Sequence, residues 1–206
     1  TILANAATAE TTAVNSERVR IHHVSVLTGV SAGPNKEGLT GAQIYLDRVN
    51  KDGGVSGRQI ELVQIDDKGD AKATEKIAQD LASKNEVLAF FLPRTSPSTQ
   101  ALLKVTESAG VPLVGPQVGP SFLYVPEQRT AFTVRASFSA EVTRAIELQN
   151  RLGRSAFAFL AANDAFGNPL VEVATRKLNE LGLKPAAIEK INNLDPNITP
   201  ALESFA

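Results

Sequence analysis

Residues 41–67 constrain the fold more than any other part of the chain. They read GAQIYLDRVNKDGGVSGRQIELVQIDD, which combines a helical pattern, a pair of glycines, a tight turn and a short β-rich run. Gly53 and Gly54 are expected to end the helix, because glycine adopts the left-handed conformation at little cost. The run IELVQI carries apolar residues at both odd and even positions, so both faces of a strand would be apolar. This suits a parallel strand covered on both faces. A helix that feeds such a strand is half of a crossover unit, so the sequence predicts an α/β fold.

Strand and helix patterns alternate along the chain. The predicted strands lie at residues 21–27, 59–66, 87–92, 111–115, 131–135, 155–161 and 184–191. The predicted helices lie at residues 39–51, 70–83, 97–109, 138–151 and 167–181. The first strands and their crossovers predict a doubly wound lobe built on a parallel sheet. Residues 116–130 interrupt this series with three prolines and no helical pattern, so we expect the lobe boundary there.

This pattern predicts the domain organisation. We expect a flexible N-terminal segment at 1–19, a first α/β lobe at 20–118, a crossover or hinge at 119–130 and a partial second α/β lobe at 131–206. The first segment lacks an initiator methionine and the basic start and apolar centre of a secretory signal, so we expect a processed or engineered start. The chain stops within TPALESFA, which resembles the opening of a helix, so we expect the second lobe to be incomplete.

Composition excludes several classes of function. The net charge is −1 with both signs interspersed, which leaves no basic face for nucleic acid, and aromatic residues make up only 5% of the chain. No apolar run approaches 18 residues, so the sequence predicts no membrane span. Cysteine is absent, which excludes disulfides and thiolate chemistry but leaves the redox compartment undecided.

Ligands of open parallel sheets bind at the carboxyl ends of strands, beside helix N-termini. The loops in such positions are residues 28–38, 93–99 and 115–120. The second reads PRTSPST, which places hydroxyls and an arginine where a helix dipole favours an anion such as a carboxylate. We predict that Ser96 or Ser98 donates a hydrogen bond to this anion and that Arg94 supplies a counter-charge. Plain N-capping by either serine and a solvated arginine are the alternatives.

The turn and strand of residues 50–67 also carry a family resemblance. The residues concerned are Asn50, Gly53, Gly54, Val55, Gly57, Arg58, Ile60, Leu62, Asp66 and Asp67. They resemble the type I periplasmic substrate-binding proteins, the leucine/isoleucine/valine-binding family. The resemblance implies two lobes with doubly wound parallel sheets and a chain longer than this one; a generic α/β domain with a glycine-pair turn is the alternative.

The ligand loops depart from the family pattern. Branched-chain amino-acid binders place a serine near Ser96, and a threonine that helps to hold the α-amino-acid head is replaced here by Gly119. Phe166 stands where those binders have a tyrosine over the ligand, and Gln117 introduces a bulky amide. We therefore expect a solute other than leucine, isoleucine or valine, and an apolar or aromatic carboxylate would suit Phe166. The predicted ligand-binding residues are Arg94, Thr95, Ser96, Ser98, Gln117, Val118, Gly119 and Phe166.

The resemblance implies an extracytoplasmic solute-binding protein that captures an amino acid or another small carboxylate between two lobes and delivers it to the membrane permease of an ABC importer. It implies a periplasmic monomer, exported by a signal peptide outside this chain, without catalysis, cofactor, metal or nucleic-acid partner. The ligand-sensing domain of a receptor or regulator has the same fold and is the alternative, and an enzyme on a flavodoxin-like sheet is a more distant one.

Other motifs carry little chemistry. Asp66 and Asp67 resemble the acidic pair of a phosphate-accepting receiver, but strand 87–92 ends in Leu-Pro where that chemistry needs an aspartate, so we expect local capping. His22 and His23 are adjacent on a strand and point to opposite faces, so they cannot share a metal ion. Arg135 matches a family element at the crossover, and we expect it to be structural. The sequence holds no glycine-rich nucleotide-binding loop.

Overall fold

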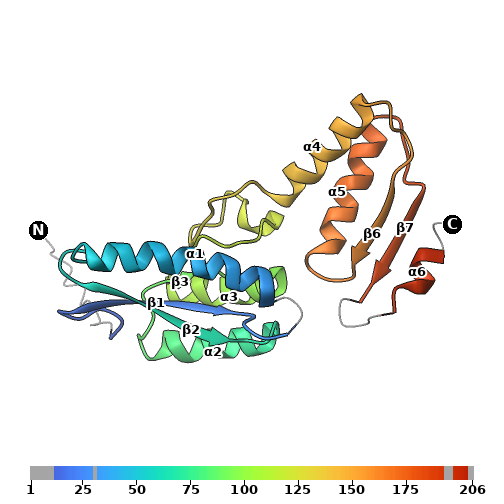
Figure 1. Cartoon of the computed structure of the whole chain (residues 1–206). Helices are drawn as coiled ribbons and strands as arrows, with labels where there is room; N and C mark the ends of the chain where they lie inside the picture. The colour runs from blue at the N-terminus through green and yellow to red at the C-terminus, as the bar shows by residue number, and fades with distance from the viewer. Residues whose placement is uncertain (1–11, 30–31, 193–196, 204–206) are drawn as a thin grey trace, which may run out of the picture.

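The computed structural model of the chain describes residues 12–29, 32–192 and 197–203 (Figure 1). Its strands are β1 (Arg18–Ser25), β2 (Gln59–Asp66), β3 (Phe90–Phe91), β4 (Leu113–Val114), β5 (Ala131–Phe132), β6 (Ala158–Ala162) and β7 (Ala187–Ile191). Its helices are α1 (Ala32–Lys51), α2 (Ala71–Ser83), α3 (Ser96–Ala109), α4 (Phe138–Arg151), α5 (Gly167–Glu180) and α6 (Thr199–Glu203), with a 3-10 turn η1 (Ser121–Leu123). The predicted α/β fold is confirmed.

The first sheet is parallel and has the strand order β2-β1-β3-β4-β5. Helix α1 covers one face of this sheet and α2 covers the opposite face (Figure 1), which is the doubly wound arrangement. The strand order reverses between β1 and β3. The carboxyl ends of the strands near such a switch point form the crevice in which α/β proteins bind ligands.

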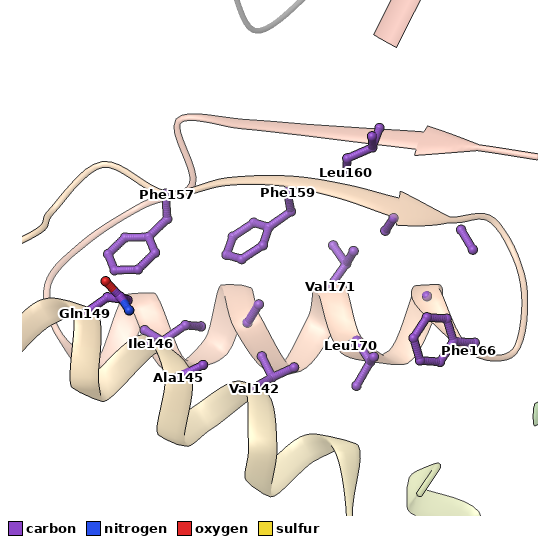
Figure 2. A pocket seen from close by; sticks show the side chains of 14 residues that line it. Val142, Ala145, Ile146, Gln149, Phe157, Phe159, Leu160, Phe166, Leu170 and Val171 are labelled. Carbon is purple, nitrogen blue, oxygen red and sulfur yellow. The ribbon is translucent and has the colours of Figure 1, made fainter. Parts of the chain in front are cut away.

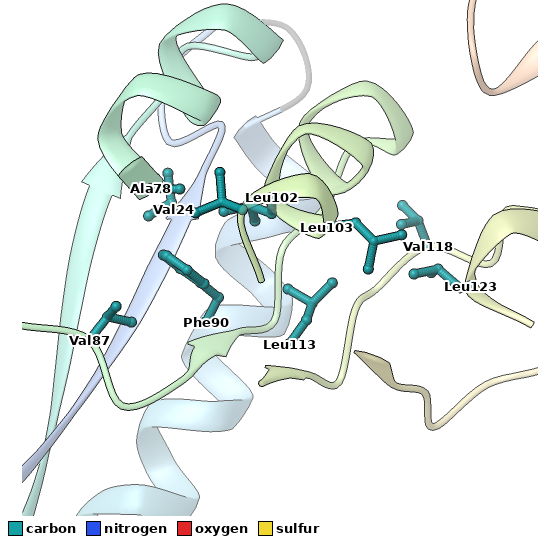
Figure 3. Packing of buried hydrophobic residues seen from close by; sticks show 10 residues of the cluster. Val24, Ala78, Val87, Phe90, Leu102, Leu103, Leu113, Val118 and Leu123 are labelled. Carbon is teal, nitrogen blue, oxygen red and sulfur yellow. The ribbon is translucent and has the colours of Figure 1, made fainter. Parts of the chain in front are cut away.

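The core of the first sheet lies between its strands and the helices α2 and α3 (Figure 3). Phe90, Leu102 and Leu113 are fully buried there, and Val24 of β1 points to the same side. Burying each of these large side chains stabilises the fold by roughly 1.5–3 kcal/mol. His23 precedes Val24 and therefore faces the opposite side, toward α1, where its ring contacts Asn35.

Helix α1 begins at Ala32, so the prediction of a loop that extends to Gly38 is wrong. Pro34 lies in the first turn of the helix, where the missing amide removes no helical hydrogen bond. Gly38 lies inside the helix at a position where a Cβ would stand 2.5 Å from Oε1 of Gln117. The sequence gives no sign of this distant contact, so the glycine was predicted to lie in a loop. Residues 30–31 of the predicted loop lie outside the described residues.

Strand β5 belongs to the first sheet. The predicted strand 131–135 was expected to open the second lobe, but Ala131 pairs with Leu113 and Phe132 pairs with Val114 of β4. Parallel pairing places β5 at the edge of the first sheet, and the chain leaves for the second lobe only after it. Strands β3 and β4 are also much shorter than predicted, because only two residues of each meet the ladder geometry.

The ordered fold begins before residue 20. Residues 1–11 of the segment expected to be flexible lie outside the described residues. Within the rest of that segment, the Thr12 amide donates to the carbonyl of Asn85 at 3.0 Å, Ala13 is buried, and β1 begins at Arg18. The first strand therefore extends the predicted one by several residues toward the N-terminus.

Among the described residues, the second lobe has a two-stranded parallel sheet, β6-β7, with α4 and α5 packed side by side and α6 in contact with β7. Ile146 of α4 and Ala174 and Leu178 of α5 form its buried core. A crossover segment, residues 133–137 between β5 and α4, joins it to the first lobe, and the Tyr124 hydroxyl of the first lobe donates to the carbonyl of Arg135 in this segment at 2.8 Å. Among the described helices, none is long and apolar enough to span a membrane.

Candidate ligand-binding site

A cavity of about 480 Å³ lies where the carboxyl ends of β3 and β4 meet the first turns of α4 and α5. We call it the interlobe pocket, because residues of both lobes line it. Its volume falls in the range typical of small-molecule sites. Its lining residues are Pro34, Arg94, Thr95, Ser96, Pro97, Gln117, Val118, Arg135, Phe138, Asp164 and Phe166.

Most of the predicted site residues meet at this cavity. The two predicted loops are joined directly, because the Gln117 amide donates to the Pro93 carbonyl at 2.9 Å. Ser98 and Gly119 are not among the lining residues: Ser98 is fully buried in the first turn of α3, and Gly119 lies against the backbone of the crossover. The predicted residues that line the pocket are Arg94, Thr95, Ser96, Gln117, Val118 and Phe166.

One lining residue at the start of α3, Ser96, carries a buried hydroxyl without a partner among the described residues. Thr95 is the N-cap, and its hydroxyl accepts a hydrogen bond from the Ser98 amide at 3.2 Å. The alternative prediction that Ser96 or Ser98 caps the helix is therefore wrong. Ser96 is 3% exposed, and its Oγ has no hydrogen-bond partner among the described residues. Because the Thr95 side chain occupies the capping position, Ser96 is left with its hydroxyl at the positive end of the helix dipole.

The hydroxyls of Ser98 and Thr99 are also buried without a partner among the described residues. Leaving a buried hydroxyl unpaired costs roughly 1–3 kcal/mol, so three neighbouring cases are unusual in a native fold. Only Ser96 of these three lines the pocket. The Ser96 hydroxyl and Arg135 Nε are the buried polar atoms of the lining that have no hydrogen-bond partner among the described residues.

Gln117 directs its side chain into the first lobe. Its Nε2 donates to Asn35 Oδ1 at 2.9 Å and to the Leu92 carbonyl at 3.1 Å, while Oε1 lies beside Gly38. The side-chain carboxamide of Gln117, which was expected to enter the site, is thus hydrogen-bonded to residues of the first lobe. Leu92 adopts a left-handed φ of 58°, which is strained for this residue.

The Gln117 side chain ends a buried polar network that begins in the sheet. His23 Nδ1 lies 3.1 Å from the Phe91 carbonyl, and its Nε2 lies 3.1 Å from Asn35 Nδ2. These partners assign the neutral tautomer with the proton on Nδ1, because Asn35 Nδ2 can only donate. Burial lowers the pKa of His23, which keeps the ring neutral at ordinary pH.

Arg135 links the crossover to the pocket wall. Its Nη1 donates to the Gln117 carbonyl at 2.9 Å, Nη2 pairs with Glu141, and the guanidinium carbon lies 4.7 Å from the ring centre of Phe138. Phe138 in turn meets Phe166 edge to face, with ring centres 5.2 Å apart. The expected structural role of Arg135 agrees with these bonds. The cation and the two rings form one continuous wall.

The remaining charged groups of the lining are Arg94 and Asp164. The Arg94 amide donates to Ser25 Oγ at 3.1 Å, and its guanidinium forms no ion pair with any described residue. Asp164 Oδ1 accepts hydrogen bonds from the Phe166 and Gly167 amides at 2.8 and 3.0 Å, which caps the start of α5. Arg94 therefore offers its charge to the pocket, while the Asp164 carboxylate is engaged with its own helix.

Three lining residues that carry chemistry are not predicted by the sequence, namely Arg135, Phe138 and Asp164. Arg135 had been noted at the crossover, but nothing in the sequence shows that its side chain reaches the cavity. Asp164 follows a strand by a short loop, which is a position where a ligand contact could have been predicted. Phe138 opens α4, and its orientation depends on Arg135 and Phe166.

A second cavity, of about 370 Å³, lies in the second lobe between α4, α5 and β6 (Figure 2). The Phe157 and Phe159 side chains point from the strand toward the two helices, and Leu160 points to the other side (Figure 2). Its lining is apolar apart from the Gln149 side chain, so it lacks a group that could hold a charged solute. Among the described residues, no three histidine, aspartate or glutamate side chains gather as a metal site would require.

Comparison with known proteins gives one consistent result. Residues 18–205 match a protein family described as "Periplasmic binding protein". An "Amino acid binding protein" of Pseudomonas aeruginosa is 26% identical over 165 residues, which cover 79% of this chain and 44% of that protein. The chain therefore spans about half the length of the relatives it matches.

Solved structures agree in fold. A substrate-binding periplasmic protein from Ralstonia solanacearum is 26% identical with a TM-score of 0.81, over 90% of this chain and 53% of that one. A solute-binding protein of an ABC transporter from R. palustris, in complex with benzoate, has a TM-score of 0.81 at 16% identity, over 91% of this chain and 52% of that one. The second likeness is one of fold alone.

Proposed function

Because the chain belongs to the periplasmic binding protein family, we propose that it is the solute-binding component of an ABC importer and captures a small carboxylate in the interlobe pocket. The observation that carries this proposal is the buried, unpartnered hydroxyl of Ser96 at the positive end of α3. A carboxylate bound there would accept its hydrogen bond and lie near the charge of Arg94. Such charge-assisted hydrogen bonds contribute roughly 1.5–3 kcal/mol each.

Capture would couple binding to lobe closure. The pocket draws Ser96 and Val118 from the first lobe and Phe166 from the second, so a solute that contacts both walls binds the closed arrangement more tightly. A ligand shifts such an equilibrium by its difference in affinity between the two states. The crossover segment between β5 and α4 would serve as part of the hinge, since domain closure concentrates its dihedral changes in such connections.

The family supports a proposal for the location and the partner. We place the protein outside the cytoplasm, in the periplasm, with a membrane permease as the partner that receives the solute. We assign it no catalytic step. The lining contains Arg94, the hydroxyls of Thr95 and Ser96, and two aromatic rings, which are groups suited to holding a solute. Uptake of labelled solute into vesicles that carry the permease would test delivery, and uptake that does not depend on the added protein would contradict it.

Isothermal titration calorimetry of the intact protein with a panel of small carboxylates tests the binding site. Ser96→Ala should weaken binding about 10- to 100-fold, because it removes a hydrogen bond to a charged group. Ser108→Ala is the matched control: it removes a hydroxyl from the other end of α3, where Ser108 bonds the Val105 carbonyl. Failure of every carboxylate to bind, or equal binding by both variants, would contradict the proposal.

A further inference from the structure

The described residues of the interlobe pocket are equipped to bind an anion and poorly equipped to bind an ammonium group. Resting on the proposed function, we infer that the solute is a small carboxylate with an apolar body and no α-ammonium group, and not a zwitterionic amino acid. The hydrogen-bond acceptors, the charges and the apolar wall of the described residues each support this inference.

An ammonium group donates three hydrogen bonds and therefore needs oxygen acceptors. Three backbone carbonyls at this end of the first sheet are already engaged. The Leu92 carbonyl accepts from Gln117 Nε2 at 3.1 Å, the Pro93 carbonyl accepts from the Gln117 amide at 2.9 Å, and the Gly119 carbonyl accepts from the Phe138 amide at 2.6 Å. A solute ammonium would have to share or displace these bonds.

Gly119 offers no hydroxyl, and its surroundings leave no room for one. A Cβ at this position would stand 2.7 Å from the Ala136 carbonyl oxygen and 3.1 Å from the Phe138 amide nitrogen. Because both neighbours are backbone atoms, a serine or threonine side chain would require the crossover to move. The loop after β4 is thus built around a glycine.

The charges around the pocket point the same way. Arg135 Nη1 donates to the Gln117 carbonyl at 2.9 Å, so an ammonium at that oxygen would lie against a guanidinium. Glu141 pairs with Arg135. Asp164 is the one carboxylate among the described lining residues, and it accepts from two backbone amides at the start of α5. Arg94 has no ion-pair partner among the described residues, so its positive charge is the one left for a solute.

The wall contributed by the second lobe suits an apolar body. Phe138 and Phe166 meet edge to face at 5.2 Å and both line the cavity, and Val118 lines it from the first lobe. Aromatic rings prefer such edge-to-face and offset contacts with one another. A solute that buries a phenyl or branched alkyl group here would contact these side chains while its carboxylate meets Ser96.

Matched pairs of solutes test the inference by calorimetry on the intact protein. The first pair is 3-phenylpropanoate and L-phenylalanine, and the second is 4-methylpentanoate and L-leucine; each pair differs only in the α-ammonium group. We expect the compound without the ammonium group to bind at least tenfold more tightly in at least one pair. Tighter or equal binding of the amino acids would overturn this inference and leave the proposed function standing. Absence of binding by any carboxylate would overturn both.

Asp164→Asn provides a second readout. Asparagine also caps helices well, so the start of α5 should be preserved. Under the inference, removing this negative charge tightens binding of the ammonium-free carboxylate by about two- to tenfold, because like charges in one pocket repel. A selective loss of amino-acid affinity of tenfold or more would identify Asp164 as an ammonium acceptor and overturn the inference.

Discussion

Gln117 Nε2 lies 2.9 Å from Asn35 Oδ1, and this hydrogen bond ties the loop after β4 to the inner face of α1. Asn35 is fully buried, so its carboxamide has no access to water if the bond is lost. The same asparagine donates to the Val26 carbonyl at 2.7 Å and contacts His23. The Asn35 side chain thus joins the sheet, the helix and the pocket loop. Because it is buried, the loss in free energy of unfolding on removing any of these hydrogen bonds can be predicted.

A double-mutant cycle measures this coupling. We expect Asn35→Ala and Gln117→Ala each to lower the free energy of unfolding by about 1–3 kcal/mol, because each leaves a buried polar partner unpaired. The double variant should lose less than the sum, with a coupling of about 0.5–3 kcal/mol. Urea denaturation at pH 7 provides the measurement. Strictly additive losses would show that the two side chains do not interact.

Gly38 provides an independent test of where the Gln117 carboxamide lies. Alanine normally stabilises an exposed helical position over glycine by about 0.5–1 kcal/mol, and we expect this gain for Gly41→Ala, since a Cβ there has no atom within 4 Å. We expect Gly38→Ala, in the same helix, to destabilise the fold, because its Cβ would stand 2.5 Å from Gln117 Oε1.

Combining the two changes identifies the cause. In a Gln117→Ala background, Gly38→Ala should no longer destabilise and should approach the gain of Gly41→Ala. Thermal and urea denaturation of the unchanged protein, Gly38→Ala, Gln117→Ala, the double variant and Gly41→Ala would show this reversal. If Gly38→Ala stabilises the otherwise unchanged protein, the Gln117 carboxamide moves aside freely. That outcome would contradict a carboxamide held by Asn35 and the Leu92 carbonyl.

The fold could be predicted because its signals are local. The helix that precedes Gly53, the buried run that forms β2 and the alternation of helices and strands all depend on neighbouring residues in the chain. The start of α1 and the placement of β5 could not be predicted in this way. Gly38 is accommodated by Gln117, and Ala131 pairs with Leu113, and both contacts join residues that are far apart in the sequence.

The candidate site shows the same division. Thr95, Ser96 and Val118 follow strand ends, so the rule for open parallel sheets places them at one edge, and they do line one cavity. Whether they bind a ligand stays a prediction. The direction of the Gln117 side chain and the contribution of Phe138 depend on tertiary contacts with Asn35 and Phe166. Residue type and spacing carry no information about these contacts.

The two glycines that follow α1 differ in how much room they leave for a side chain. Both residues have positive φ, 100° for Gly53 and 73° for Gly54. A Cβ at Gly53 has no atom within 4 Å, whereas a Cβ at Gly54 would stand 2.0 Å from the Arg58 carbonyl oxygen. We expect Gly53→Ala to cost about 1–2 kcal/mol from backbone strain alone. Gly54→Ala should cost at least about 1 kcal/mol more, because the clash is with backbone. Equal losses in urea denaturation would contradict this account.

Asp66 should make the stability depend on pH in the acid range. The Thr28 hydroxyl, with the Leu27 and Lys68 amides, lowers the pKa of Asp66 from 3.8 to about 2. The folded state therefore binds fewer protons than the unfolded state between these values. The stabilisation by Asp66 is fully present above about pH 4 and is lost as the pH falls toward 2.

Two variants separate this contribution from general acid unfolding. Asp66→Asn should be less stable than the unchanged protein at pH 7, and the difference should shrink between about pH 4 and pH 2, where the native carboxylate takes up its proton. Thr28→Val keeps the carboxylate but removes its principal donor, so its difference should be smaller and should shrink over the same interval. Urea denaturation in a series of buffers from pH 7 to pH 2.5 gives both curves. A difference for Asp66→Asn that stays constant across this series would mean that the hydrogen bonds to Asp66 do not stabilise its ionised form.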